Sequence, residues 1–211
     1  MKITLIVDNP DSWIIPYVEK LKSILELKHA VRMVNKYPQI RKGDLAFFLS
    51  CEKIVKPEIL RLHKHNLVVH ESKLPKGRGW SPMTWQILAG KNKIPITLFE
   101  AAKTVDSGPI YLQDHLNFNG HELIDQIRQE QGEKTIELIV KFVNAYPNAG
   151  SRKQRGQPTY YPRRTLQDSQ LDVNKTIKQQ FNKLRVVDNR RYPAYFYHRG
   201  HKYILAITEI K

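Results

Sequence analysis

The sequence has very little cysteine and no long hydrophobic run. Cys51 is the one cysteine among 211 residues, so no disulfide can form within the chain, and this suits a reducing compartment. No apolar run approaches the roughly 20 residues that are needed to cross a bilayer. The run Ile3–Val7 ends at Asp8 and is too short for the apolar region of a signal peptide. We therefore expect a cytoplasmic protein that is not inserted in a membrane.

Acidic residues are also scarce. The chain has 20 Asp and Glu against 35 Lys and Arg, a formal net charge of +15. Residues 151–211 alone hold 14 of the basic and 4 of the acidic residues. Such basicity suits nucleic acid, an anionic small molecule such as a nucleotide diphosphate, or simply a solvated basic surface. Because no pattern of a nucleic-acid-binding module is present, we do not expect nucleic acid as a partner.

The order of the predicted elements indicates the fold class. Hydrophobic residues make up 41% of the chain, enough for a core. We expect strands at 1–7, 30–34, 45–49, 66–70, 95–99 and 110–112, and helices at 13–27, 57–63, 82–88 and 121–146. Strands that alternate with helices predict an α/β fold with a mostly parallel sheet covered on both faces. Gly132 is expected to weaken the middle of the last helix.

The C-terminal part has a different character. Residues 148–157 are polar and contain glycine, which predicts a linker. We expect it to join a larger α/β domain at 1–148 to a small basic α+β subdomain at 149–211. That subdomain should hold a helix near 177–184 and a hairpin that turns around Arg199–Gly200.

One stretch carries most of the chemical information. Residues 66–70 form a strand that ends on His70, and a loop with two prolines, two glycines and three cations follows. The tips of strands that lead into Gly-rich loops are where open α/β sheets place ligand sites. A histidine there can move protons near neutral pH, although a strand-end histidine can also be satisfied by the backbone. Asp106 precedes the next predicted strand, where it is either a partner of His70 or an ordinary turn residue.

These residues also carry a family resemblance. Residues 70–108, HESKLPKGRGWSPMTWQILAGKNKIPITLFEAAKTVDSG, resemble the core of the formyltransferases that use 10-formyltetrahydrofolate. The positions in register are His70, Ser72, Leu74, Pro75, Gly79, Pro82, Thr97, Asp106 and Gly108. The family has an asparagine two residues before the histidine, where this chain has Val68. The resemblance implies a Rossmann-like formyltransferase domain.

The C-terminal part resembles the segment that follows the catalytic domain in nucleotide-sugar N-formyltransferases. The matching positions are Thr159, Tyr160, Arg163, Arg164, Thr165, Asp168, Asp172, Arg185, Pro193 and Ala194. Val173 replaces an aromatic residue that this group usually has. The WSPMTWQIL version of the loop resembles proteins of bacterial surface-sugar pathways, including nonulosonic acid synthesis.

The resemblance implies a reaction and a set of residues. An amine attacks the formyl carbon of 10-formyltetrahydrofolate, and His70 and Asp106 move protons and hold the oxyanion, without a metal. The folate would lie along Ser50, Cys51, Lys53 and Ile54 on one side and Leu98, Phe99 and Glu100 on the other. The acceptor would be held by Lys76, Arg78 and Trp80. The alternatives are core and turn positions for the folate residues, a solvated loop for the acceptor residues, and a small buried hydrophobe for Cys51.

Val68 leaves the role of the family's asparagine open. Residues i and i+2 of a strand share a face, so Val68 should lie beside His70, and valine cannot donate a hydrogen bond. Asn66 lies four residues before His70, roughly 13 Å along an ideal strand, and we interpret it as structural. Water, a backbone N–H or another side chain such as Ser72 would then take the role, with Asn66 and Ser72 as auxiliary candidates.

Three functions compete at this point. The leading hypothesis is an N-formyltransferase for a nucleotide-linked amino sugar, for instance a UDP-linked 4-amino sugar, acting as a monomer or a homodimer. The second is formylation of methionyl-tRNA, which the net charge favours and the length of the chain opposes. The third is a non-catalytic module that binds folate or a nucleotide, which the valine at position 68 favours.

Overall fold

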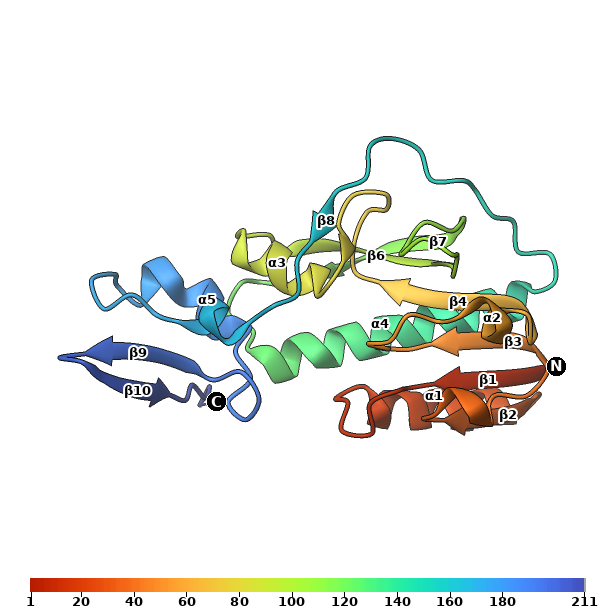
Figure 1. The fold of residues 1–211 in the computed structure, drawn as a ribbon, viewed down its shortest axis with the longest axis horizontal. Coiled ribbons are helices and arrows are strands. Elements are labelled where there is room, and N and C mark those ends of the chain that lie inside the picture. Colours follow the sequence, from red (N-terminus) through yellow and green to blue (C-terminus); the bar gives the residue numbers. More distant parts are fainter. Residues whose placement is uncertain (211) are drawn as a thin grey trace.

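A six-stranded sheet forms the centre of the molecule (Figure 1). The structure is a computed structural model that describes residues 1–210. The strand order is β2-β1-β3-β4-β6-β7. The strands are β1 (Lys2–Ile6), β2 (Ala30–Val34), β3 (Gly43–Phe48), β4 (His63–His70), β6 (Lys93–Glu100) and β7 (Ile110–Asn117). The mostly parallel α/β sheet that the sequence predicts is thereby confirmed.

The last two strands depart from the parallel expectation. Strands β1 to β4 pair in parallel, whereas β6 runs antiparallel to β4 and β7 antiparallel to β6. The loop 101–109 between β6 and β7 is too short for a parallel crossover, which needs a dozen or more residues. The same loop carries Asp106. The loop begins beside Asn66 of β4, and within it Asp106 lies 3.6 Å from His70 at the end of β4.

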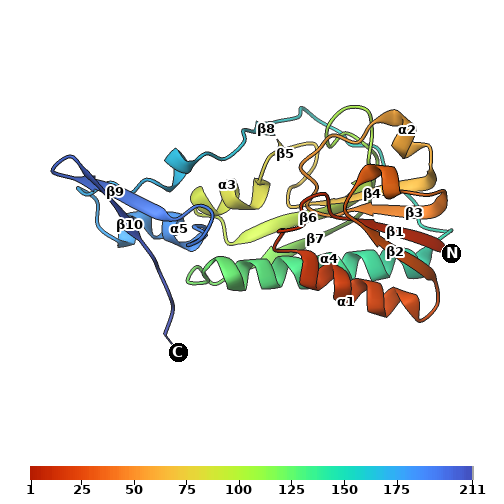
Figure 2. The same cartoon turned by 60° about the horizontal axis from the view of Figure 1, so that its bottom comes forward.

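Helices cover the two faces of the sheet unequally. Helices α1 (Ile15–Glu26) and α4 (Ile124–Ala145) pack side by side on one face (Figure 2). The main core between them and the sheet includes Val18, Leu21, Leu25, Leu45, Phe47, Leu67, Leu98, Ile139 and Phe142. Helix α2 (Pro57–Leu60) lies over the opposite face. Helix α3 (Pro82–Leu88) packs against β6, β7 and α4.

Two helical predictions need correction. The helix predicted at 57–63 ends at Leu60, because His63 belongs to β4, where its Nε2 lies 2.9 Å from Oγ1 of Thr4. Gly132 does not weaken α4, which runs unbroken through it. A Cβ atom at position 132 would lie 2.4 Å from the ring of Tyr17, so glycine is what lets α1 and α4 approach closely.

The segment predicted as a linker is attached to the domain. Residues 148–157 form no helix or strand, but the backbone of Arg152 pairs with that of Ile110 at 2.8 and 2.9 Å. Strand β8 (Tyr160–Tyr161) then pairs in parallel with β5 (Arg78–Gly79), which lies in the loop that follows His70. The chain therefore returns across the sheet edge before it reaches the C-terminal part.

The C-terminal part forms the narrow end of the molecule (Figure 1). Its elements are η2 (Leu166–Ser169), η3 (Lys178–Gln180), α5 (Phe181–Arg185), β9 (Ala194–His198) and β10 (His201–Leu205). The predicted hairpin turns at Arg199–Gly200 as expected, whereas the predicted helix near 177–184 is divided into η3 and α5. The fully buried Arg185 contacts Asn92 at 2.8 Å and Glu122 at 3.2 Å, which fastens this part to the sheet domain.

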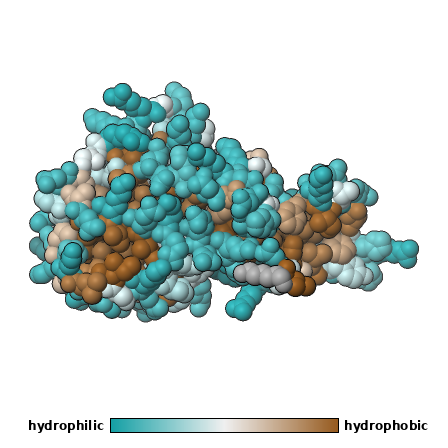
Figure 3. Space-filling view, turned by 180° about the vertical axis from the view of Figure 1, so that it is seen from behind, coloured by the Kyte–Doolittle hydropathy of each residue, from teal (hydrophilic) through white to brown (hydrophobic). Residues whose placement is uncertain are grey.

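The surface of the narrow end is partly apolar. Figure 3 shows hydrophobic side chains gathered there, and the exposed hydrophobic residues of this part include Tyr197, Tyr203, Ile204 and Ile210. No helix within residues 1–210 is long and apolar enough to span a membrane.

Candidate active site

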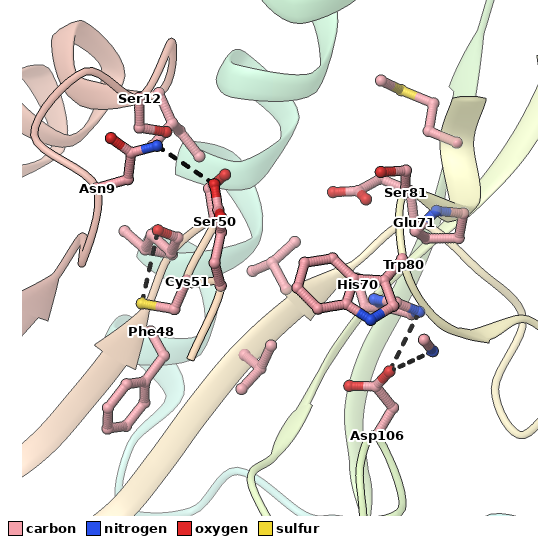
Figure 4. Close-up of a pocket in the computed structure, with 18 of the residues that line it drawn as sticks. Asn9, Ser12, Phe48, Ser50, Cys51, His70, Glu71, Trp80, Ser81 and Asp106 are labelled. Atoms are coloured by element: carbon pink, nitrogen blue, oxygen red, sulfur yellow. Dashed lines mark hydrogen bonds and ion pairs between the residues drawn. The ribbon is translucent and has the colours of Figure 1, made fainter. Parts of the chain in front are cut away.

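A cavity of about 480 Å³ opens where β3 and β4 end. The residues that line it come from the loops after β1, β3 and β4, from the loop 101–106, and from α3, α4 and the C-terminal part. In Figure 4, His70 and Asp106 lie near Trp80 on one side of the cavity, and Ser50 and Cys51 lie on the other. This is the position that the strand-tip argument predicts for a ligand site.

His70 ends β4 and is held firmly. Its side chain is 9% exposed, and its Nε2 lies 2.8 Å from the carbonyl oxygen of Gly77 and 3.6 Å from Oδ2 of Asp106. A contact to a carbonyl oxygen requires that Nε2 carries the proton, so Nε2–H donates to Gly77 in this arrangement. The Asp106 carboxylate, 3.6 Å from the same nitrogen, is close enough to stabilise a positive charge on the imidazole ring.

Asp106 is fixed from two sides. The backbone N–H of Gly79 donates to its Oδ2 at 2.8 Å, and the Gln154 side chain donates to its carbonyl oxygen at 2.8 Å. Its φ of 51° lies in the left-handed region, a strained conformation for a residue other than glycine. Gly79 has a φ of 94°, and a Cβ atom there would lie 2.6 Å from the carbonyl oxygen of Tyr161. The carboxylate is therefore held by a glycine that cannot be replaced without shifting β8.

The folate residues predicted after β3 all line the cavity. Ser50, Cys51, Lys53 and Ile54 are on its wall, and Ser50 adopts a φ of 52°. The carboxylate of Asp8, directly after β1, accepts the N–H of Glu52 at 2.9 Å and of Lys53 at 2.9 Å, and so shapes this loop. Sequence reasoning missed Asp8, although an acid directly after a buried strand was a usable signal.

Cys51 has the environment of a packed thiol. Burial, followed by the charge of Asp8, raises its pKa to about 12, and its Sγ lies 3.4 Å from the carbonyl oxygen of Ile6. A thiol with so high a pKa carries almost no thiolate at neutral pH. Cys51 can therefore shape the cavity wall but cannot serve as a nucleophile.

The opposite wall of the predicted folate site is only partly where we expected it. Phe99 lines the cavity together with Ala101, Ala102 and Val105. Side chains alternate along β6, so Leu98 points into the main core and Glu100 lies on that same face. The Glu100 carboxylate contacts His65 Nδ1 at 3.1 Å and accepts the backbone N–H of Asn66 at 2.6 Å. Leu98 and Glu100 are thus structural residues outside the cavity.

The predicted acceptor residues separate in the same way. Trp80 lines the cavity mouth, and the guanidinium of Arg163 lies 4.7 Å from the centre of its ring. Arg78 is buried behind the loop, where it donates to Gln154 at 2.7 Å, and it does not reach the cavity. Lys76 is exposed and also lies outside the cavity. Residues 148–157, which we call the strap, and β8 pack against Arg78. This packing accounts for its position.

Arginines from the C-terminal part supply the positive charge that the loop does not. Arg163, Arg164 and Arg191 line the cavity together with Arg128 of α4. Arg128 is neutralised by Asp188 at 2.9 Å. Arg163 contacts Glu52 at 3.5 Å across the cavity mouth. Sequence reasoning found Arg163 and Arg164 as matching positions but did not predict that they reach the site.

The auxiliary candidates lie away from the reacting groups. Asn66 donates its side-chain N–H to the carbonyl oxygen of Leu60 at 2.8 Å and does not line the cavity. The buried hydroxyl of Ser72 has no hydrogen-bond partner within residues 1–210 and is also outside the cavity. Val68 does line the cavity beside His70. No side chain at the family position can donate a hydrogen bond, so water or a backbone N–H stays the prediction for that role.

The site combines an imidazole, a fixed carboxylate and a mixed apolar and basic cavity. Such a pair can move a proton and stabilise a developing oxyanion next to a bound substrate. Within residues 1–210, no group of three or more His, Cys, Asp or Glu is placed to hold a metal ion.

Comparison with known proteins identifies the class. A family model described as formyl transferase matches residues 25–143, more than half of the chain. The chain therefore belongs to the formyl transferase family, a family of enzymes, as the resemblance implied.

Particular relatives differ in what they act on. A methionyl-tRNA formyltransferase of Thermotoga neapolitana is 30% identical over 173 residues, which cover 80% of this chain and 52% of that protein. A solved methionyl-tRNA formyltransferase from Clostridium thermocellum superposes with a TM-score of 0.85 at 20% identity, covering 100% of this chain and 94% of that one. A solved 4-N formyltransferase from Francisella tularensis gives 0.79 at 19% identity, covering 100% and 98%.

The matches differ in how much of each relative they cover and in sequence identity. The chain spans about half the length of the curated relatives it matches. The two structural matches lie below 25% identity and show the fold alone.

Proposed function

We propose that the protein transfers a formyl group from 10-formyltetrahydrofolate to the amino group of a nucleotide-linked amino sugar. The observation that carries the proposal is the pair His70 and Asp106, 3.6 Å apart, in a cavity whose acceptor side is lined by Trp80 and Arg163. An aromatic ring beside guanidinium groups suits a nucleobase and a diphosphate. The reacting pair lines the same cavity as the residues proposed to hold folate.

The folate wall fits a pterin and a carboxylate tail. Phe99, Val68 and Leu49 give it an apolar surface, and Lys53 and Lys103 line its outer part. Ser50, Cys51, Lys53, Ile54 and Phe99 would hold the co-substrate, which supplies the formyl group when bound. The residues of this chain would orient that group and exclude water from it.

In the proposed reaction, the acceptor nitrogen forms a bond to the formyl carbon, and the bond from that carbon to the folate nitrogen breaks. His70 stabilises the oxyanion formed on the way. The acceptor nitrogen loses one proton and the leaving folate nitrogen gains one, and Asp106 keeps His70 in the orientation for that transfer.

The direct test is a substrate panel. Purified protein is offered UDP- and dTDP-linked sugars with a 4-amino or a 3-amino group, together with 10-formyltetrahydrofolate. We expect a mass gain of one formyl group on one of these acceptors. The variant in which His70 and Asp106 are both alanine is the control, and it should give no product. Folate binding by wild type with no formylation of any amine would favour the non-catalytic module, which the valine at position 68 supports.

Formylation of methionyl-tRNA is the second candidate. It is favoured by the curated relatives, of which the first is 30% identical, and by the net charge of +15. Charged initiator tRNA therefore belongs in the same panel. Formylated methionyl-tRNA, with no sugar product, would replace the first proposal by the second.

Three further points are part of the proposal. The division into residues 1–148 and 149–211 is supported by the separate small core of Leu171, Leu184, Val187 and Ala194. A homodimer is supported by the apolar surface of the narrow end (Figure 3). A cytoplasmic location agrees with the lone, unpaired Cys51 and with a folate co-substrate.

A further inference from the structure

Glu71 is a carboxylate in the cavity that the mechanism above does not use. It follows His70 directly and lines the cavity. Figure 4 places Glu71 on one side of His70 and Asp106 on the other. The side chain of Gln131 on α4 donates to Glu71 Oε1 at 2.7 Å, and that of Gln86 on α3 donates to the Glu71 carbonyl oxygen at 2.6 Å. Two helices therefore position this residue at the site.

The carboxylate of Glu71 has no cationic partner. Among residues 1–210 it forms no ion pair, because Arg128, the charged residue of α4 that lines the same side, is paired with Asp188. Burial raises the pKa of Glu71, the charge of His70 lowers it, and that of Asp106 raises it. Glu71 is partly buried, and a carboxylate partly withdrawn from water without a counter-ion is costly. A ligand that brings a positive charge to this point would offset that cost.

We propose that Glu71 binds the ammonium group of the acceptor and takes its proton before the formyl transfer. The inference rests on the proposed function, because the acceptor amine is its ligand. Alkyl ammonium groups lose their proton at about pH 8–10, so most of the acceptor enters protonated and without a free electron pair. A carboxylate whose pKa is raised by burial is a better base for such a proton than an exposed one.

The proton balance of this step is complete. The ammonium gives one proton to the Glu71 carboxylate and becomes a neutral amine with a free electron pair. That pair forms the bond to the formyl carbon. The second proton of the nitrogen passes through His70 to the leaving folate nitrogen, and Glu71 returns the first proton to water after the product leaves.

The test compares two kinds of acceptor with Glu71→Gln. Glutamine keeps the shape and can still accept the hydrogen bond from Gln131, but it cannot take a proton. With an amino-sugar acceptor at pH 7 we expect turnover to fall by at least roughly 100-fold, and to recover as the pH rises through the pKa of the amine. With an alkoxyamine analogue, whose nitrogen is already unprotonated at neutral pH, turnover should stay within several-fold of wild type. Glu58→Gln, an exposed carboxylate on α2 away from the cavity, is the matched control.

A binding experiment gives a readout that does not depend on turnover. Calorimetry with tetrahydrofolate present compares a UDP-linked 4-amino sugar with its 4-hydroxy counterpart. Wild type should prefer the amine, and Glu71→Gln should bind the two alike. Equal losses of turnover for both acceptors, or an unchanged amine preference in the variant, would overturn the role of Glu71 and leave the proposed function intact. A wild type that formylates no amine of the panel overturns the proposed function, and this inference with it.

Discussion

At the scale of single residues, the site depends on how one proton and one carboxylate are held. His70 Nε2 lies 2.8 Å from the Gly77 carbonyl and 3.6 Å from Asp106. The carbonyl fixes the tautomer, and the carboxylate would stabilise the imidazolium that forms when a proton is taken up. The neutral ring therefore keeps Nδ1 as the nitrogen that is free to accept a proton.

We predict that His70→Ala lowers turnover by at least roughly 100-fold while the fold survives. The imidazole is the group that can move protons at neutral pH next to both substrate sides. Steady-state formylation is measured with circular dichroism and thermal unfolding as the check on folding. A well-folded variant with near-wild-type turnover would remove His70 from the mechanism.

We predict that Asp106→Asn nearly abolishes turnover but leaves folate affinity within several-fold. Asparagine can still accept the hydrogen bond from Gly79 N–H, now 2.8 Å from Asp106, so the loop should keep its geometry. It carries no charge to stabilise the imidazolium, so the loss should fall on the chemical step. Fluorescence titration with a folate analogue and saturating kinetics separate the two effects. Weak folate binding with normal turnover at saturation would make Asp106 a binding residue instead.

The sequence could predict some of these residues and not others. His70 and Asp106 could be named from the sequence, because His70 ends a predicted strand and both belong to a forty-residue family pattern. Glu71 was not, since alternation along a strand does not say where the first residue beyond its end will point. Arg78 was misplaced because a cation in a Gly-rich loop can turn inward as well as outward, and the strap that holds it through Gln154 is distant in sequence.

At the scale of elements, local sequence patterns predicted where helices and strands lie better than they predicted the direction in which the strands run. The bounds of β2 and α3 agree with those expected from the apolar pattern and the flanking prolines and glycines. The antiparallel course of β6 and β7 does not follow from strand propensity, which is the same in either direction. It follows from the length of the loop 101–109, and that length only becomes clear once the strand ends are known.

We predict that Gly132→Ala lowers the free energy of unfolding by about 1–3 kcal/mol through overpacking. Helix propensity alone would predict a gain of about 1 kcal/mol. The close approach of Tyr17, 2.4 Å from where the new Cβ would stand, should reverse that sign. Urea denaturation gives the value, and Gln129→Ala, exposed on the same helix, is the control. A variant more stable than wild type would show that α1 can move away at little cost.

We predict that His63 makes the fold less stable in mild acid. Burial lowers its pKa in the folded state. As the pH falls below about 6.5, the unfolded chain therefore takes up a proton that the folded chain does not, and stability is lost. His63→Gln cannot titrate, so the loss of stability between about pH 7 and 5 should be smaller than in wild type. Denaturation at several pH values measures this, with the exposed His201→Gln as the comparison. Identical slopes in all three proteins would contradict the assignment.

At the scale of the whole molecule, the site is assembled from distant parts of the chain. Residues 48–55 and 101–106 line the cavity from the sheet domain, while Arg163, Arg164, Arg191 and Tyr192 reach it from the C-terminal part. Val186 of the same part is buried against Met83, Ile87 and Ile127. Neither contact can be read from local sequence patterns, since each depends on the path of the strap 148–157 across the sheet edge.

The last prediction concerns what the basic C-terminal part binds. We expect it to serve acceptor binding or subunit contact and not tRNA, so a chain cut at Asn148 should be poorly soluble or inactive. The cut would expose the cluster around Ile87 and Ile127 and remove Arg163 from the cavity mouth. The cations of this part lie among aromatic residues, as Arg163 does over Trp80 at 4.7 Å and Lys202 over Tyr195 at 4.1 Å. Such a mixture suits interfaces and nucleotides.

Initiator tRNA should then bind at low salt through charge alone, and its binding should be lost steeply at physiological salt, because each neutralised phosphate adds to the salt dependence. Filter binding over a salt series measures this. Tight binding that resists salt, together with formylation of charged tRNA, would show that the arginines of the C-terminal part bind tRNA.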